Sequence, residues 1–277
     1  MTIRGVLFDH VAVAAEDQHQ LWPRYVGDLG GRWIGGGGTV GFFSAQVSYA
    51  NAMRLEVLEP YQVERNDFLR RFLDRNGPGP HHLTFKVPDL GAALEEADGA
   101  GYSPVGVDMS DPGWQEAFLH PKDAPGIVVQ LARSSHEGQW SSPPPAEVAT
   151  LPTGPSAALI HVAHALCRPA DGTRLFAGLL GGEQVAAGAG WLDLDWPGGN
   201  RVRLLDASGS GPLADWVGSR PGRLHHLGFL CEEPGTIAGA KPTADDGLWT
   251  VEPEENLGVR LLLTSDPDLF QQGRLGY

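Results

Sequence analysis

The sequence predicts an α+β protein built from four copies of one unit, in which a strand is followed by a helix and then by three strands. Short segments of alternating polarity recur between turns, in a chain that contains 38 glycines and 22 prolines. Polar residues also recur at a nearly constant interval, because His82 follows His10 by 72 positions and Gln130 follows Glu56 by 74. Such self-similarity indicates a repeated architectural unit.

The first unit begins with a strand over Val6–Ala14, and we expect a helix over Glu16–Leu29 that ends at two glycines. The strands Val40–Tyr49 and Ala52–Leu58 are predicted to pair through a turn near Asn51. The glycine run Gly35–Gly38 is interpreted as a hairpin tip and not as a phosphate loop, because no Gly-Lys-Ser/Thr follows it. A short amphipathic helix, Asp67–Asn76, ends this unit.

The second unit repeats the order. Its predicted elements are a strand, a helix and three further strands, in this order: His82–Val87, Leu90–Ala100, a strand around Val105, Ala117–His120 and Ile127–Ala132. In the first of these, Leu83 and Phe85 face one side, while His82 and Thr84 face the other. His81 is expected on the packing side, buried and hydrogen-bonded.

A proline- and serine-rich stretch separates two predicted domains. We expect a first domain over residues 1–134, an extended linker over 135–156, and a second domain over 157–277. The second domain echoes the first through His161, the segment Arg201–Leu205, and the pair His225–His226. The paired units therefore predict two related domains.

Composition limits the partners and the compartment. The net charge of −14 opposes nucleic-acid binding, and no apolar run approaches the length of a membrane span. Two cysteines do not make a disulfide framework, and the N-terminus does not read as a signal peptide, so we expect a cytoplasmic protein. A small molecule is the expected partner, and a homodimer is compatible with the sequence.

Four polar residues are the candidate metal ligands, because they recur at matched places on first and last strands, opposite the packing aliphatics. These are His10, Glu56, His82 and Gln130. Two imidazoles, a carboxylate and an amide oxygen form a mixed nitrogen and oxygen set that suits Zn, Fe(II), Mn, Co or Ni. We therefore expect a divalent metal ion whose identity stays open.

The chain resembles the vicinal oxygen chelate superfamily, which includes glyoxalase I, methylmalonyl-CoA epimerase and extradiol dioxygenases. The matching segments are Phe8–Val13, Arg54–Pro60, Pro80–Phe85, Phe118–Lys122 and Gly126–Leu131, and their order is most similar to the epimerase branch. The resemblance implies βαβββ modules paired into two glyoxalase-like domains with half-barrel mixed sheets. It also implies a divalent metal chelated by two neighbouring substrate oxygens, with His10, Glu56, His82 and Gln130 as ligands.

Two departures from the epimerase pattern stand out. No acidic residue occurs between Leu29 and Leu55, where epimerase-like members carry a second acid on the strand before Glu56, and Gln46 lies on that strand here. Gln130 can coordinate a metal but cannot take a proton near neutral pH. In the second half, Leu205 and Leu262 are expected where Glu56 and Gln130 lie in the first, so we expect that half to have lost metal binding.

Three functions remain open from the sequence. The first is a metal-dependent isomerase or lyase that stabilises an enolate, with Glu56 as the catalytic base or a metal-bound hydroxide in that role. The second is a non-haem Fe(II) extradiol-type dioxygenase, because two histidines and one carboxylate leave positions open for oxygen and a catechol. The third is a non-catalytic small-molecule binder of the resistance type.

Overall fold

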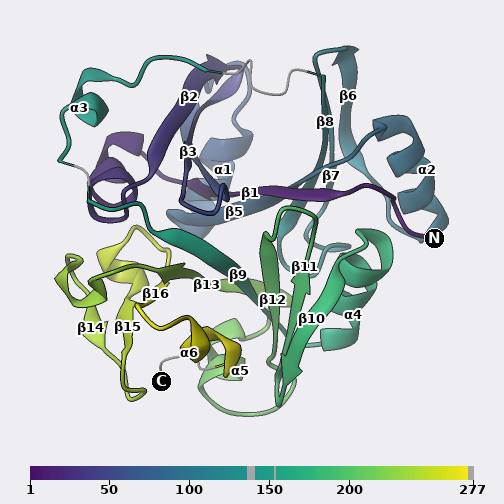
Figure 1. Cartoon of the computed structure of the whole chain (residues 1–277). Coiled ribbons are helices and arrows are strands. Elements are labelled where there is room, and N and C mark those ends of the chain that lie inside the picture. Colours follow the sequence, from purple (N-terminus) through teal and green to yellow (C-terminus); the bar gives the residue numbers. More distant parts are fainter. Residues whose placement is uncertain (136–140, 153, 274–277) are drawn as a thin grey trace. The chain divides into compact units, whose positions relative to one another are not determined.

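The strands of the protein form two mixed sheets in a computed structural model that describes residues 1–135, 141–152 and 154–273 (Figure 1). The eight strands of the first sheet lie in the order β2-β3-β4-β1-β5-β8-β7-β6, and those of the second in the order β10-β11-β12-β9-β13-β16-β15-β14. Each order places two four-strand modules side by side, joined through their first strands. The predicted α+β class with four paired βαβββ modules is confirmed.

The first sheet takes all its strands from the N-terminal half. Their bounds are β1 Leu7–Ala14, β2 Arg32–Thr39, β3 Gly41–Ser48, β4 Arg54–Tyr61, β5 Gly79–Lys86, β6 Val105–Asp111, β7 Trp114–Leu119 and β8 Val128–Ser134. Two helices belong to these modules, α1 Phe68–Asn76 and α2 Leu90–Gly99. The helix α1 packs on β3 and β4, while α2 packs on β7 and β8.

The second sheet repeats this arrangement in the C-terminal half. Its strands are β9 Ala158–Leu166, β10 Glu183–Gly188, β11 Trp191–Asp195, β12 Arg201–Asp206, β13 Gly222–Leu230, β14 Lys241–Pro242, β15 Leu248–Val251 and β16 Leu261–Thr264. The remaining helices are short: α3 Ala146–Ala149, α4 Pro169–Thr173, α5 Pro212–Val217 and α6 Pro267–Gln271. Among the described residues, no helix is both long enough and apolar enough to cross a membrane.

Backbone contacts divide the chain into two compact units, and each unit draws on both halves of the sequence. The first comprises Met1–His10, His82–Glu137 and His161–His225, and the second comprises Val11–His81, Gly138–Ile160 and His226–Tyr277. The division into domains at residues 135–156 therefore stays a prediction. Residues 136–140 and 153 of the predicted linker lie outside the described part of the chain.

An aromatic cluster forms part of the core of the first unit. Phe8 stacks on Phe85 with ring centroids 4.9 Å apart, and the Trp196 ring lies 5.0 Å from Phe85 and 5.9 Å from Phe8. The side-chain amide of Asn200 donates to the carbonyl oxygen of Phe8 at 2.7 Å. Residues close to His10 in the sequence are thus held by residues about 190 positions away.

The second unit has its own core beneath α1. Ala12 and Ala14 of β1 pack with Leu58 of β4 and with Leu69 and Leu73 of α1. These α1 residues lie four apart, so they share one face of the helix. The strand β4, which carries Glu56, is thereby fixed against both a helix and the end of β1.

Two local predictions in the first module were wrong. Gly35–Gly38 is not a hairpin tip but lies inside β2, where the backbone N–H of Gly36 donates a hydrogen bond to Ser142 Oγ at 2.9 Å. The expected helix over Glu16–Leu29 is replaced by a 3-10 turn at Gln18–Gln20 and a π-helical turn at Pro23–Asp28. Proline cannot donate a backbone hydrogen bond inside a helix, so Pro23 starts a new turn instead.

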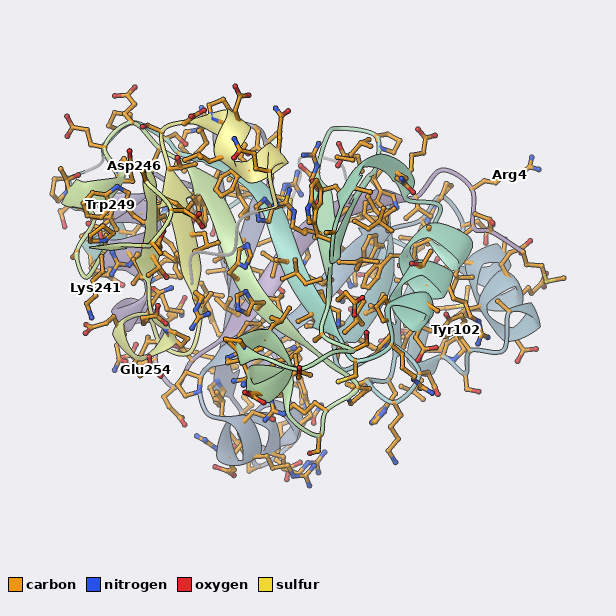
Figure 2. The ribbon with its side chains drawn as sticks, turned by 90° about the horizontal axis from the view of Figure 1, so that it is seen from below. Arg4, Tyr102, Lys241, Asp246, Trp249 and Glu254 are labelled. Carbon is orange, nitrogen blue, oxygen red and sulfur yellow. The ribbon has the colours of Figure 1, made fainter. Side chains whose placement is uncertain are left out.

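The outer strand of the second sheet is very short. The strand β14 consists of Lys241 and Pro242 alone, and Trp249 of β15 pairs with Pro242. Figure 2 labels Lys241 and Trp249 on these two strands. Proline offers no N–H and lysine adds charge, and both features discourage edge-to-edge association of sheets. This edge is therefore poorly suited to pairing with another strand.

Candidate metal centre

Three of the predicted ligands lie in the first compact unit. His10 is on β1, His82 on β5 and Gln130 on β8, and all three are buried. The parallel register of β5 and β8 places Thr84 opposite Gln130. Because side chains alternate along a strand, His82 and Thr84 share one face of β5, as the sequence predicts.

The imidazole of His10 is held by the residue before it. Its Nδ1 lies 2.8 Å from Asp9 Oδ2, and an ionised carboxylate only accepts, so Nδ1 carries the proton. That hydrogen bond leaves Nε2 as the nitrogen able to coordinate a metal, an arrangement typical of metal-binding histidines. The His82 ring lies 5.7 Å from the His10 ring, at an angle of 67°.

The Thr84 hydroxyl connects His10 to Gln130. Its oxygen lies 2.9 Å from His10 Nε2, and it donates to Gln130 Oε1 at 2.6 Å. A hydroxyl has a single proton, so Thr84 cannot donate to both groups at once. Coordination of a metal by Nε2 would remove that competition and leave the Thr84 proton to the Gln130 amide oxygen.

Glu116 of β7 is a carboxylate of this network that sequence reasoning missed. Its Oε2 accepts hydrogen bonds from Gln130 Nε2 at 2.7 Å and from Trp114 Nε1 at 2.9 Å. Because a carboxylate accepts and does not donate, Glu116 fixes which end of the Gln130 amide carries the oxygen. The predicted strand begins at Ala117, whereas β7 begins at Trp114 and so includes Glu116.

Glu56 lies in the second compact unit, on β4, and is also buried. The antiparallel register of β3 and β4 pairs it with Gln46, whose Nε2 donates to Glu56 Oε1 at 3.2 Å. Gln46 thus lies on the strand where the epimerase pattern has its second acid. An amide at this place can orient Glu56 but cannot exchange a proton with a substrate.

His10, Glu56 and His82 form a group able to hold a metal ion. One ligand atom from each lies within 4.8 Å of the others, and the three residues are buried. Their donor set of two imidazoles and one carboxylate fits borderline divalent metals, for which Zn–N and Zn–O bonds are roughly 2.0–2.2 Å.

His81 has a different environment from His82. It is buried against the rings of Phe72 and Phe68, whose centroids lie 4.6 and 6.1 Å away. Burial lowers the pKa of His81 to about 4, and the charge of Glu56 opposes this shift only in part. His81 is therefore neutral at physiological pH, in agreement with the packing role predicted from the alternation of β5.

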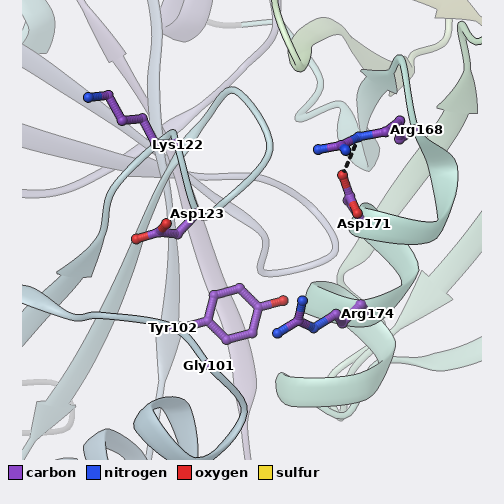
Figure 3. Close-up of a pocket in the computed structure, with 7 residues that line it drawn as sticks. All are labelled: Gly101, Tyr102, Lys122, Asp123, Arg168, Asp171 and Arg174. Atoms are coloured by element: carbon purple, nitrogen blue, oxygen red, sulfur yellow. Dashed lines mark ion pairs between the residues drawn. The ribbon is translucent and has the colours of Figure 1, made fainter.

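A separate polar hollow of about 180 Å³ lies in the first unit (Figure 3). Arg174 lies over the ring of Tyr102 at 5.1 Å, and Arg168 pairs with Asp171 at 2.8 Å. Lys122, which precedes β8, also lines this hollow. None of the four predicted metal ligands does.

The family comparison covers part of the first sheet. Residues 9–118 match the sequence model of the family described as Glyoxalase/Bleomycin resistance protein/Dioxygenase superfamily. This range includes His10, Glu56, His82 and Glu116. None of the curated proteins compared with the chain matches it.

Solved structures resemble the chain over one half or over nearly all of it. A hypothetical protein from Staphylococcus aureus is 12% identical with a TM-score of 0.59, and the match covers 93% of this chain and 98% of that one. Methylmalonyl-CoA epimerase from Mycobacterium tuberculosis is 25% identical with a TM-score of 0.42, covering 47% of this chain and 88% of that one. The S. aureus match extends the fold likeness across both sheets.

Proposed function

We propose that the protein is a divalent-metal-dependent enzyme of the isomerase or lyase type. Residues 9–118 match the sequence model of the Glyoxalase/Bleomycin resistance protein/Dioxygenase superfamily, which supports this proposal. The substrate would be a small oxygenated molecule with a carbonyl group. The observation that carries the proposal is the buried group of His10, Glu56 and His82, whose ligand atoms lie within 4.8 Å of one another.

A metal bound by this group, with Gln130 as a fourth ligand, would act as a Lewis acid that polarises the carbonyl and offsets the charge of an enolate. Asp9 would keep the proton on His10 Nδ1 and so keep Nε2 available. Thr84 and Glu116 would hold the Gln130 amide from its two ends. The chain thus supplies both the ligands and the groups that orient them.

Glu56 is the residue to which we assign proton transfer. A base must take the proton next to the carbonyl, and Glu56 is the carboxylate among the proposed ligands. Gln46 donates to its Oε1 at 3.2 Å, which would help to orient the carboxylate for this role. Substitution of Glu56 would then lower the rate of the reaction more than any accompanying loss of metal affinity explains.

Metal analysis combined with a proton-exchange assay tests this proposal. The purified protein is assayed for bound metals, titrated with Zn²⁺, Co²⁺, Mn²⁺ and Fe²⁺, and incubated in D₂O with methylmalonyl-CoA, 2-hydroxyketones and hemithioacetals. Glu56→Gln should abolish deuterium incorporation next to the carbonyl, while Glu64→Gln, at an exposed position, should leave it unchanged. Full turnover by metal-loaded Glu56→Gln would refute the assignment.

A second candidate is a non-haem Fe(II) dioxygenase, favoured by the two-histidine, one-carboxylate donor set. Oxygen uptake by the Fe(II)-loaded protein with a panel of catechols distinguishes it from an isomerase, which consumes no oxygen. If no divalent ion binds at micromolar concentration, a non-catalytic binding function replaces both.

A further inference from the structure

The second sheet carries a buried ion pair between two neighbouring strands, β11 and β12. Arg203 of β12 donates from Nε and Nη2 to the two carboxylate oxygens of Asp193 on β11, both at 2.7 Å. The two side chains are 0% exposed. A guanidinium is always charged, so this site holds a permanent cation of the chain itself.

Arg203 holds the place in its module that Glu56 holds in the first. The strands β4 and β12 both begin with an arginine, Arg54 and Arg201, and the third residue is Glu56 in one and Arg203 in the other. The sequence predicts Leu205 at this position, but Leu205 lies two residues further along β12. Leu205 is paired with Trp191 near the start of β11.

The neighbouring strand confirms this equivalence. Glu56 is paired across the antiparallel ladder with Gln46, and Arg203 is paired in the same way with Asp193. In each module the two side chains are hydrogen-bonded to each other. The first sheet therefore pairs a neutral amide, Gln46, with a carboxylate, Glu56. The second sheet pairs a carboxylate, Asp193, with a guanidinium, Arg203.

The surroundings of Arg203 favour a fixed organic cation. The Trp191 ring lies 4.6 Å from its guanidinium carbon, a distance at which a ring face stabilises a cation. His161, the counterpart of His10, is buried, and its pKa is well below the ordinary value because of burial and the charges of Arg203 and Arg201. His161 is thus a neutral imidazole beside a positive charge.

We propose that Arg203 takes the place of the metal ion in the second sheet, where its guanidinium and Asp193 complete the centre without any bound ion. A divalent cation would be repelled by the guanidinium and would have to compete for the Asp193 carboxylate, which already accepts two hydrogen bonds. The chain would therefore bind one metal ion, in the first sheet, although it contains two copies of the same architecture.

Co²⁺ titration of the full-length protein tests the proposal through stoichiometry, followed by absorbance and by calorimetry. We expect one equivalent per chain in the wild type and none in a His10→Ala/His82→Ala variant. Retention of an equivalent by that variant, or two equivalents in the wild type, would overturn the proposal. Both measurements leave the second sheet unaltered, so they do not depend on how it tolerates substitution.

A second variant tests the role of Arg203 directly. The double substitution Asp193→Gln/Arg203→Glu reproduces the Gln46–Glu56 pair of the first sheet, and we expect it to bind one Co²⁺ more than the wild type. A folded variant with unchanged stoichiometry would contradict the proposal. If the wild type binds no Co²⁺, the metal centre proposed for the first sheet is refuted. The role of Arg203 is still decided in that case, by whether the double variant gains one equivalent of Co²⁺ over the wild type.

Discussion

Removal of the Asp193 charge should destabilise the protein far more than removal of the Asp195 charge. Asp193→Asn keeps the size of the side chain but leaves the buried Arg203 guanidinium without the carboxylate that balances its charge. Breaking a buried ion pair from one side costs about 3–5 kcal/mol. For a chain of this size each kcal/mol lowers the melting temperature by about 2–4 °C, so we expect a loss of about 6–20 °C.

Asp195 provides the matched control on the same strand. It pairs with Arg201 at 2.6 and 2.9 Å, but these side chains are 20% and 22% exposed. Solvent screens such a pair, and Asp195→Asn should cost about 1 kcal/mol or less. Both substitutions replace a carboxylate by an amide, one at a fully buried position that contacts two arginines and one at a partly exposed position that contacts Arg201.

Urea denaturation and thermal unfolding at pH 7 measure both losses. A third variant, Asp193→Leu/Arg203→Met, removes both charges together and should recover most of the stability lost in Asp193→Asn, because well-packed apolar residues often replace a buried pair at little cost. Equal losses for Asp193→Asn and Asp195→Asn, or a double variant no more stable than the single one, would refute the reasoning.

Three further outcomes follow from other contacts. Gly126→Ala should lower the free energy of unfolding in urea by about 2–5 kcal/mol, and Gly190→Ala by about 1–2 kcal/mol. Both glycines have φ near +80°, but of the two only Gly126 would place a Cβ against another group, 1.9 Å from the Gly222 carbonyl oxygen. Equal losses would exclude the clash. Asp9→Ala should weaken Co²⁺ binding about 10–100-fold by calorimetry, and an unchanged affinity would exclude its orienting role. Burial lowers the pKa of His164 to about 4 from its ordinary 6.5, so unfolding takes up a proton and about 3 kcal/mol of stability is lost as the pH falls from about 6.5 to 4. His164→Asn should reduce that pH dependence by one proton in urea titrations, and an unchanged slope would contradict it.

The predicted ligands were accessible from the sequence because each depends on strand phase and on a repeat interval. His10, Glu56 and His82 lie on one face of their strands whatever the loops between them do. The same reasoning predicted the βαβββ order. Strand phase and repeat interval do not depend on the exact residue at which a strand begins. They therefore predict which residues share a face of a strand, but not which residues lie at the start of a strand.

The residues that were missed depend on strand starts and on a reversal of charge. Glu116 was left out because β7 begins three residues before the predicted strand. Arg203 was missed because a search for a repeated metal site looks for the same donor type, whereas this position has the opposite charge. The pairing of Asp193 with Arg203 appears only when the ladder register is known.

The composition of the two compact units bears on how the protein can be divided. In the first unit, the backbone of Ile3 donates to Leu179, and the His164 ring contacts the carbonyl oxygen of Pro125 at 2.7 Å. A chain severed within the proline-rich stretch would split these contacts between two fragments. Each fragment expressed alone should expose apolar surface and aggregate, and co-expression of the two should restore a soluble, cooperatively melting complex, as in a split-protein complementation pair.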